Sequence, residues 1–542
     1  MMRHKPGRGR LTAAAGSIAL LVSACTGGGG GSASPVSGST GAGSPTSLAQ
    51  GPPPQPPPQL GKTAVDDAVA KLDGIVKDTM AKTGVPGMAV AVVRQDQVVY
   101  LKGSGLRQVG KPDTVGPDTV FQLASVSKPL ASTVVAGAVG QKTVSWDDPV
   151  VKHDRGFALK DPWTSDHVTV ADLFSHRSGL PDHAGDLLED LGYDRDYVLA
   201  HLRDDPLAPF RASYAYTNFG LTEAAVAVAK AKSTTWEDLS ADLLYKPLGM
   251  HSTSSRFADY DKALDKAVIH VRVNDSWQAK YTRDPDAQSP AGGASSSVRD
   301  LAQWVRLQLG GGKVDGKQII DADALERTHL PAALSSPPAA PGGRTGFYGL
   351  GWNVSYDDHG RLRLGHSGAF SLGAATAVML LPTEQLGIVA LTNGEPVGAP
   401  EAVTETFLDI AQNGSASVDW LGFFGKLIAA SARSDKSKVD YSKPPAAPGP
   451  AKPDASYVGT YGNGYYGPLT VSAQDGGLVM ELGPKRMRFP LQHYDNDTFS
   501  YETEGENAAG RSGVTFGRGA SDTATKVTVE SLDHTGLGTF NR

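Results

Sequence analysis

The spacing of hydrophobic residues predicts a helix followed by two strands at the start of the main globular region. Apolar residues in 64–83 recur every three or four positions, as on one face of a helix. Two valine-rich runs, 88–94 and 98–102, flank the polar stretch 95–97, which is typical of two strands joined by a tight turn. We therefore expect a helix to lead into a pair of neighbouring strands.

The middle of the chain is mostly helical, and strand patterns return near residue 350. Helical spacing is found in 221–230, 236–244, 298–309 and 401–410, and strand patterns in 349–356, 361–364, 374–381 and 387–393. Strands at both ends with helices between them predict an α+β fold, in which one antiparallel sheet is flanked by helices. We expect a cleft between this sheet and the helical region.

A proline-rich stretch separates this region from the C-terminal part of the chain. Residues 434–453 contain five prolines and show no apolar periodicity, so they predict neither helix nor strand. Residues 454–542 contain short alternating runs separated by glycine-rich turns, which is typical of a small all-β sandwich or barrel. We therefore expect two globular domains, 63–433 and 454–542, joined by a linker.

The first 62 residues carry the features of an export signal and a tether. Residues 1–24 combine four basic residues with an apolar stretch too short to span a membrane. The stretch 21–25 resembles a bacterial lipobox, and Cys25 is the one cysteine of the chain, so it is a candidate for lipidation rather than for a disulfide. Residues 25–62 are rich in glycine, serine and proline and cannot form a core. We expect an extracytoplasmic protein, anchored to the bacterial cell membrane by a lipid.

The charge of the chain argues against nucleic acid as a partner. Cleavage of the signal peptide would change the formal net charge from −6 to −10, because it removes four basic residues and no acidic ones. No basic cluster is found in the remaining sequence. The expected partner on these grounds is the membrane, reached through the lipid, and not nucleic acid.

Ser125 and Lys128 form the first candidate for catalysis. The apolar run 129–139 predicts a helix that begins near the serine, and a separation of three residues places both side chains on one face. A lysine at this distance can act as a base toward the hydroxyl when burial and the helix dipole lower its pKa. Ser-x-x-Lys is therefore a minimal nucleophile for acyl transfer.

Two later motifs offer groups that could complete such a site. Tyr216 and Asn218 are separated by one residue, so an extended backbone would place the phenol and the amide on the same side. A phenol near Lys128 could serve first as general base and then as general acid. His366 and Gly368 follow an alternating strand pattern, so the backbone there could line a cleft.

Together these motifs resemble those of the penicillin-recognising serine hydrolases, in the group around class C β-lactamases, D-aminopeptidases and family VIII esterases. Further blocks similar to this family follow in the family's order across residues 85–394. The resemblance implies a β-lactamase/transpeptidase-like fold and an acyl-enzyme mechanism without a cofactor or a metal. The C-terminal region resembles the lipocalin-like domain that often follows such hydrolases.

The resemblance also implies catalytic roles. Ser125 is expected to attack the carbonyl of the substrate, while Lys128 and Tyr216 handle its proton. The backbone N–H groups of Ser125 and Ala369 are expected to hold the oxyanion. Loss of one such donor typically costs about 3 kcal/mol of transition-state stabilisation.

Asn218, His366, Gly368 and Ala369 are expected to contact the substrate. Penicillin-binding relatives usually carry a lysine where His366 stands, which gives a permanent cation for a carboxylate. A histidine has only a partial charge near neutral pH. This difference favours esters and D-amino-acid peptides over β-lactams, so we expect a cell-envelope esterase or D-amino-acid peptidase whose partner is a small molecule or a cell-wall peptide or ester substrate.

Other interpretations stay open at this level. Residues 365–369 nearly match the Gly-x-Ser-x-Gly nucleophile elbow, which would make Ser367 the nucleophile, but the βαβ repetition of that fold is absent upstream. A metal hydrolase is disfavoured because His176 and His183 do not belong to a His-Glu-x-x-His pattern. The chain could also be a true β-lactamase, or an envelope binding or sensor protein that keeps the scaffold without turnover.

Overall fold

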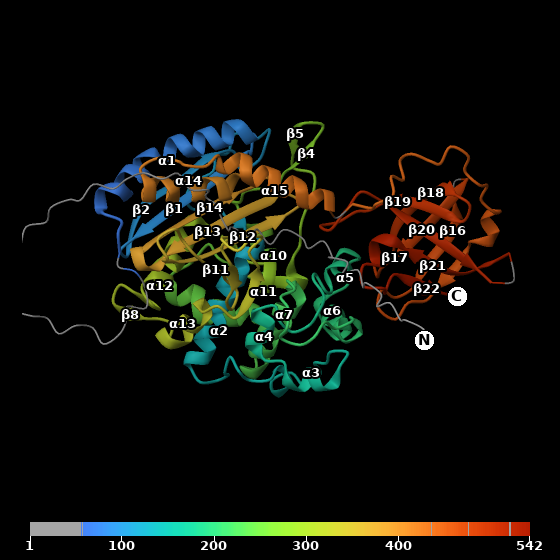
Figure 1. The fold of residues 1–542 in the computed structure, drawn as a ribbon, viewed down its shortest axis with the longest axis horizontal. Helices are drawn as coiled ribbons and strands as arrows, with labels where there is room; N and C mark the ends of the chain where they lie inside the picture. Colours follow the sequence, from blue (N-terminus) through green and yellow to red (C-terminus); the bar gives the residue numbers. More distant parts are fainter. Residues whose placement is uncertain (1–55, 57, 435, 475, 520–521) are drawn as a thin grey trace, which may run out of the picture.

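Two bodies of different architecture lie side by side in the computed structural model (Figure 1). The structure describes residues 56, 58–434, 436–474, 476–519 and 522–542. The predicted signal peptide, Cys25 and most of the first linker lie outside the described residues. The larger body contains the predicted catalytic motifs, and the smaller one is the C-terminal all-β domain.

An eight-stranded antiparallel sheet forms the centre of the larger body, in the order β2-β1-β14-β13-β12-β11-β10-β9. The two ends of the region meet in it, because β1 pairs with β14 along its whole length. The strands are β1 (Gly87–Arg94), β2 (Gln97–Gly105), β9 (Ala333–Ser336), β10 (Gly346–Tyr348), β11 (Asn353–Tyr356), β12 (Leu362–Phe370), β13 (Ala374–Leu381) and β14 (Leu386–Thr392).

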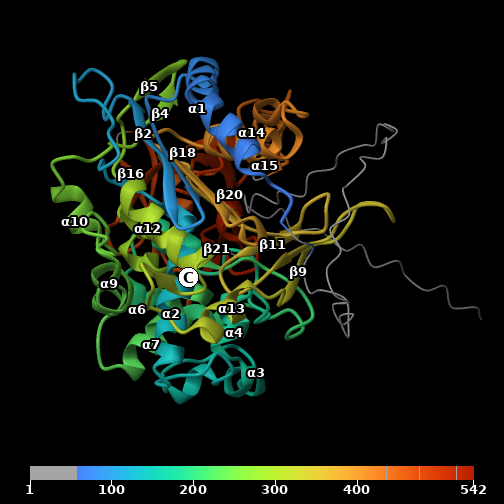
Figure 2. The ribbon, with the colours of Figure 1, turned by 90° about the vertical axis from the view of Figure 1, so that its left-hand side faces the viewer.

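Helices cover both faces of this sheet (Figure 2). On one face, Val90 and Val92 pack against helices α1 (Lys62–Thr83) and α14 (Ala399–Asn413). Ala89 and Ala91 alternate with these valines and face the other side. That side is packed by α2 (Ser127–Gly140), α12 (Val298–Leu309) and the helical region. Burial of both faces explains why β1, β13 and β14 are continuous apolar runs.

The helical region consists of short helices between the strands. They are α3 (Pro162–His167), α4 (Val170–Phe174), α5 (Asp186–Asp190), α6 (Arg195–His201), α7 (Asn218–Ala231), α8 (Trp236–Ser240), α9 (Lys246–Leu248), α10 (Phe257–Lys262), α11 (Ser289–Gly292) and α13 (Ala322–His329). Three two-stranded ribbons complete it: β3 (Phe121–Gln122) with β6 (Ser295–Ser296), β4 (Val271–Val273) with β5 (Ser276–Gln278), and β7 (Lys313–Val314) with β8 (Lys317–Gln318). Helix α15 (Trp420–Ser434) follows α14 and was not predicted from the sequence.

The C-terminal domain is one antiparallel sheet in which each strand pairs with the next. A backbone bridge between Gly462 and Asn541 joins its first and last edges, so the predicted sandwich or barrel is a closed barrel. Residues 436–453, which precede it, contain neither helix nor strand. The strands are β15 (Gly459–Tyr461), β16 (Leu469–Gln474), β17 (Gly477–Leu482), β18 (Met487–Asp495), β19 (Thr498–Glu502), β20 (Arg511–Arg518), β21 (Ala524–Val529) and β22 (Thr539–Asn541).

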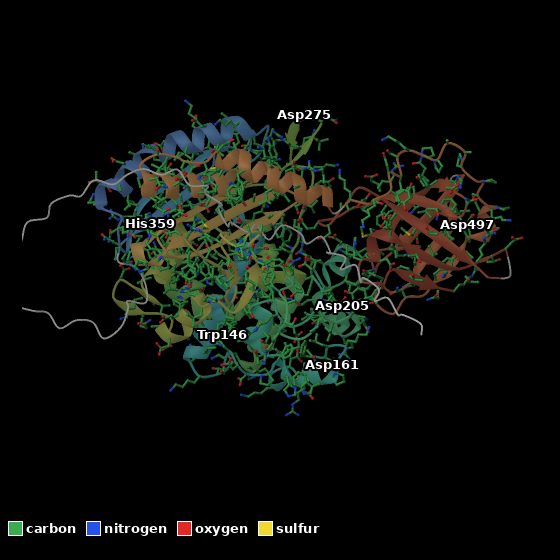
Figure 3. The ribbon with its side chains drawn as sticks, viewed as in Figure 1. Trp146, Asp161, Asp205, Asp275, His359 and Asp497 are labelled. Carbon is green, nitrogen blue, oxygen red and sulfur yellow. The ribbon has the colours of Figure 1, made fainter. Side chains whose placement is uncertain are left out.

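The two bodies share an interface formed by α5, α6 and the residues after them. Asp205 lies at this boundary, whereas Asp497 lies within the barrel (Figure 3). The Tyr465 hydroxyl donates to Asp205 Oδ2 over 3.2 Å, and the Tyr193 hydroxyl donates to the backbone oxygen of Tyr466 over 2.8 Å. Because α5 also reaches the catalytic motifs, the interface lies close to the site described next.

Candidate active site

The local backbone places Ser125 at the start of a buried helix. A single 3₁₀ turn, η1 (Ala124–Val126), leads directly into α2. Ala124 has a φ of +47°, in the left-handed region that a non-glycine residue rarely adopts. Ser125 is partly exposed, whereas Lys128, one turn further on, is fully buried. The serine hydroxyl is therefore accessible while the amine behind it is shielded from water.

The structure brings Ser125, Lys128 and Tyr216 into direct contact. Lys128 Nζ lies 3.0 Å from Ser125 Oγ, and the Tyr216 hydroxyl donates to the same oxygen over 2.8 Å. The Lys128 amine also lies 4.5 Å from the centre of the Tyr216 ring. A proton can pass between these three groups without an intervening water.

Burial brings the pKa of Lys128 close to neutral pH. Its amine donates to Asn218 Oδ1 over 2.7 Å and to the backbone oxygen of Ala291 over 3.0 Å, and both acceptors are neutral. Loss of water lowers the pKa of Lys128 to about 7, although the charge of Asp186 acts in the opposite direction. A large fraction of Lys128 is therefore neutral at physiological pH.

Asn218 positions the lysine in this structure. It is the first residue of α7, while Thr217 before it is extended, so the predicted extended segment ends one residue early. Its amide nitrogen donates to Asp186 Oδ2 over 2.8 Å, so both polar atoms of the amide have partners within the protein. The predicted contact of Asn218 with the substrate stays a prediction.

His183 and Asp186 extend this network and were not identified as site residues from the sequence. His183 Nδ1 lies 2.6 Å from Asp186 Oδ2, the oxygen that also accepts from Asn218. Burial disfavours the charged form of His183, but the hydrogen bond and the charge of Asp186 raise its pKa. The spacing of three residues was a signal that could have paired them, since Asp186 begins α5 and His183 lies in the turn just before it.

His176 packs against the ring of Tyr216 and hydrogen-bonds the backbone of the next residue. Its ring centre lies 4.6 Å from that of Tyr216, and its Nδ1 accepts the backbone N–H of Thr217 over 3.2 Å. Burial lowers the pKa of His176 well below its ordinary value, so its ring is neutral. Burial also raises the pKa of Tyr216, which keeps the phenol protonated. Tyr216 therefore meets Ser125 as a hydrogen-bond donor.

His366 is neutral and both of its ring nitrogens have partners within the protein. Nδ1 lies 2.7 Å from the backbone oxygen of Ser367, and Nε2 lies 2.9 Å from the hydroxyl of the buried Tyr348. Because the carbonyl can only accept, Nδ1 donates and Nε2 accepts the Tyr348 proton. Burial, followed by the charge of Lys128, lowers the pKa of His366 to about 3. Tyr348, which lies in a segment similar to a family block and was expected to pack in the core, is thus a further site neighbour.

Strand β12 passes close to the nucleophile because residue 368 is a glycine. A Cβ at Gly368 would lie 2.2 Å from the Leu123 oxygen and 3.0 Å from the Ser125 nitrogen. In the described part of the chain, residues 366–370 pair with β13 alone, so their other edge faces η1. This geometry is compatible with the predicted oxyanion role of the Ser125 and Ala369 N–H groups, which stays a prediction.

Ser367 lies on the opposite face of β12 from this cluster. Its hydroxyl hydrogen-bonds Glu401 of α14, the helix that covers the far face of the sheet. Alternation along the strand explains the difference, since His366 and Gly368 face Ser125 and Ser367 between them does not. The structure therefore gives no support to the nucleophile elbow at Ser367.

The match to a known family covers most of the larger body. Residues 72–412 match the family described as Beta-lactamase, and residues 443–538 match a domain of unknown function, DUF3471. The first match spans more than half of the chain. The chain therefore belongs to the beta-lactamase family.

Similar proteins include named hydrolases and penicillin-binding proteins. The protein named Unguisins hydrolase ungD' from Aspergillus campestris is 26% identical over 73% of this chain and 76% of its own length. Penicillin-binding protein 4 from Amycolatopsis lactamdurans is 28% identical over 57% of this chain and 81% of its own. Protein flp from Staphylococcus aureus is 22% identical over 62% of this chain and 66% of its own.

Solved structures confirm the predicted β-lactamase/transpeptidase-like fold. The octameric penicillin-binding protein homologue from Pyrococcus abyssi aligns over 85% of this chain and 98% of its own, with a TM-score of 0.55 and 19% identity. A class C beta lactamase from Rhodobacter sphaeroides aligns over 62% of this chain and 97% of its own, with a TM-score of 0.51 and 20% identity. At these identities the likeness concerns the fold.

No helix among the described residues is both long enough and apolar enough to cross a membrane. The predicted lipidation site, Cys25, lies outside the described residues.

Proposed function

We propose that the protein is a serine hydrolase that forms an acyl-enzyme at Ser125 while it cleaves an ester or a D-amino-acid peptide. The observation that carries this proposal is the contact of Ser125 Oγ with two proton-carrying groups, Lys128 Nζ at 3.0 Å and the Tyr216 hydroxyl at 2.8 Å. Its membership in a family of hydrolases supports the same reaction class.

Lys128 is the base in this proposal and Tyr216 the acid. At neutral pH a large fraction of Lys128 is deprotonated, because burial lowers its pKa to about 7. The neutral amine accepts the Ser125 proton as the oxygen attacks the carbonyl carbon and the tetrahedral intermediate forms. Tyr216 keeps its proton, because burial raises its pKa, and it donates to the leaving group, taking a proton back from Lys128. Water then cleaves the acyl-enzyme by the reverse proton path.

The neutral state of His366 supports an uncharged group in the substrate at this position. A pKa of about 3 leaves the ring without a positive charge at physiological pH. A β-lactam carries a carboxylate that would require a cation at this position, so we place esters, and D-amino-acid peptides whose carboxylate does not meet His366, ahead of β-lactams. Two fungal relatives are named hydrolases, which agrees with turnover rather than a silent binding role.

The cellular location is part of the proposal. The apolar stretch before Cys25 and the glycine-, serine- and proline-rich tether after it support export and a lipid anchor on the outer side of the bacterial membrane. A cell-wall peptide or ester would then be within reach of the site.

The proposal is tested with a fluorophosphonate probe that labels activated serines. We expect wild type to be labelled, Ser125→Ala to lose labelling and esterase activity by about 10⁴-fold or more, and the matched Ser367→Ala to keep both. Loss of labelling in Ser367→Ala alone would contradict the assignment of the nucleophile. Folded wild type without labelling would favour a binding protein.

The substrate class is tested by assaying p-nitrophenyl esters, D-Ala-D-Ala peptides and nitrocefin side by side. Faster turnover of the ester or the peptide is expected. If nitrocefin were hydrolysed fastest, the argument from the uncharged His366 would be wrong.

A further inference from the structure

The loop between β19 and β20 of the barrel, residues 503–510, extends onto the hydrolase domain. It is braced internally, since Thr503 N and Thr503 Oγ1 both donate to the Gly510 oxygen and Ala509 N donates to Thr503 Oγ1. It therefore presents Glu506 and Asn507 to the larger body from a fixed support, on the side where α5 lies next to the barrel (Figure 1).

This loop binds two separate elements of the hydrolase domain. The Glu506 carboxylate accepts the backbone N–H groups of Ser371 and Leu372, which directly follow β12. On the other side, the backbone N–H groups of Glu506 and Asn507 donate to the Asp190 carboxylate over 3.0 and 2.8 Å. Asp190 is the last residue of α5. The loop thus connects β12 to α5.

Both connected elements also reach the nucleophile. Helix α5 begins with Asp186, which holds Asn218 and thereby Lys128. Strand β12 carries Gly368 against the backbone nitrogen of Ser125. Ser371 is three residues beyond Gly368, so the loop crosses the end of the strand about 10 Å from the nucleophile at 3.3 Å per residue.

The fit between the barrel and this segment requires glycine at three points. A Cβ at Gly505 would lie 2.7 Å from Asp190 Cγ, one at Gly483 would lie 2.2 Å from the Leu191 oxygen, and one at Gly467 would lie 2.3 Å from the Tyr193 hydroxyl. All three glycines have positive φ values, between 73° and 109°. A side chain at any of these three positions would clash with the hydrolase domain, so the two domains fit closely here.

We propose that residues 503–510 form a clasp that closes the far end of β12, so that the enzyme accepts only substrates with a short group on that side of the scissile bond. A chain lying along the open edge of residues 366–370 meets the clasp after Phe370. Groups up to about 10 Å long fit between Ser125 and the clasp, and longer ones do not. The enzyme therefore cleaves near the end of a chain rather than within it. This inference rests on the proposed function.

The test compares variants at the two ends of the clasp. Glu506→Ala releases the loop from β12, and Asp190→Ala releases it from α5. The exposed Glu504, in the same loop, provides the matched control Glu504→Ala. Each full-length protein is assayed with p-nitrophenyl esters of two to twelve acyl carbons and with acetate esters of short and long alcohols, which probe the two sides of the scissile bond.

We expect both clasp variants to raise the ratio of kcat/KM for long substrates to kcat/KM for short substrates by about tenfold or more. The rise should occur in one of the two ester series, and in the same series for both variants. Glu504→Ala should keep the wild-type ratio. Fluorophosphonate labelling of Ser125 reports that each variant is folded and active, and Glu506→Gln replaces Glu506→Ala if the latter does not fold. Labelled variants with wild-type ratios in both series would overturn the clasp alone. Absence of labelling in wild type would overturn the proposed function and the inference with it.

Discussion

Lys128 and Arg283 are both buried basic side chains of the hydrolase domain, and their partners differ in charge. The Lys128 amine donates to three neutral oxygens, from Ser125, Asn218 and Ala291. These neutral oxygens do not fully replace the water that the ammonium group loses on burial. The pKa of Lys128 therefore falls to about 7. Lys128 can therefore give up a proton near neutral pH.

Arg283 lies among carboxylates instead. Its Nη2 donates to Glu189 Oε2 over 2.7 Å, its Nε lies 3.7 Å from Glu506 Oε2, and the charge of Asp190 also acts on it. Burial alone would lower the pKa of Arg283, but these charges raise it. Burial to a similar depth thus yields a proton acceptor in one place and a permanent structural cation in the other. A lysine among neutral oxygens can lose its proton, whereas a guanidinium keeps its proton and the surrounding carboxylates stabilise its charge.

The largest effect is expected when Lys128 is replaced by an arginine, the side chain found at position 283. Lys128→Arg puts a guanidinium, which does not lose its proton, beside Ser125. We expect kcat/KM for the best ester to fall by about 10³-fold, within the range for loss of a general base. The exposed Lys111→Arg is the matched control and should keep full activity. Near-normal activity in Lys128→Arg would show that Lys128 is not the base.

The second prediction concerns Arg283, the buried cation that neutralises three carboxylates. Arg283→Met leaves Glu189, Asp190 and Glu506 without their counter-charge, and we expect the free energy of unfolding to fall by about 3–5 kcal/mol in a denaturant titration. The cost should grow as pH rises, because the pKa of each of these three carboxyls is already raised, and protonation at low pH removes the repulsion.

A matched surface variant separates this effect from loss of any ion pair. Arg299 pairs with Asp118, and both side chains are at least half exposed. Arg299→Met should cost about 1 kcal/mol or less. Equal losses for the two variants would remove the distinction between the buried cluster and an ordinary surface pair.

The sequence predicted the parts of the site that lie in local motifs. Ser125 and Lys128 are one helical turn apart, and Tyr216 and His366 belong to short recognisable segments, so their meeting required only the family fold. Arg283 and Glu506 belong to no motif, and Tyr348, in a segment similar to a family block, was expected to pack in the core. They reach their positions through tertiary contacts, and Glu506 comes from a different domain, so no local pattern identified them.

The same reasoning explains which elements were predicted. Strand β13 and helix α12 have the predicted bounds, because their apolar pattern matches their burial. Strand β12 extends to Phe370 rather than ending at residue 364, because pairing with β13 continues across two glycines that interrupt the pattern. Strand β18 has a weak apolar pattern because only two of its residues, Phe489 and Leu491, are buried.

The smallest expected effect concerns Asp186, whose charge raises the pKa of Lys128 without a direct hydrogen bond to it. Wild-type activity should rise with pH through an acid limb near 7, because the neutral form of Lys128 is the base. The charge of Asp186 raises the pKa of Lys128, so Asp186→Asn should move this limb to lower pH. On the acid side of the limb, the rate of Asp186→Asn relative to its own plateau should rise by about threefold.

The position of the limb separates this electrostatic effect from a loss of positioning. Asp186 also hydrogen-bonds Asn218 and His183. A lower plateau rate in Asp186→Asn would therefore report a loss of positioning and not a change in the pKa of Lys128. Asp196→Asn is the matched control: Asp196 is an exposed carboxylate of α6, so the limb should stay in place. A limb that moves to higher pH in Asp186→Asn would mean that the titrating group is not Lys128. The contrast with Arg283, whose guanidinium keeps its proton among carboxylates, would then lose its basis.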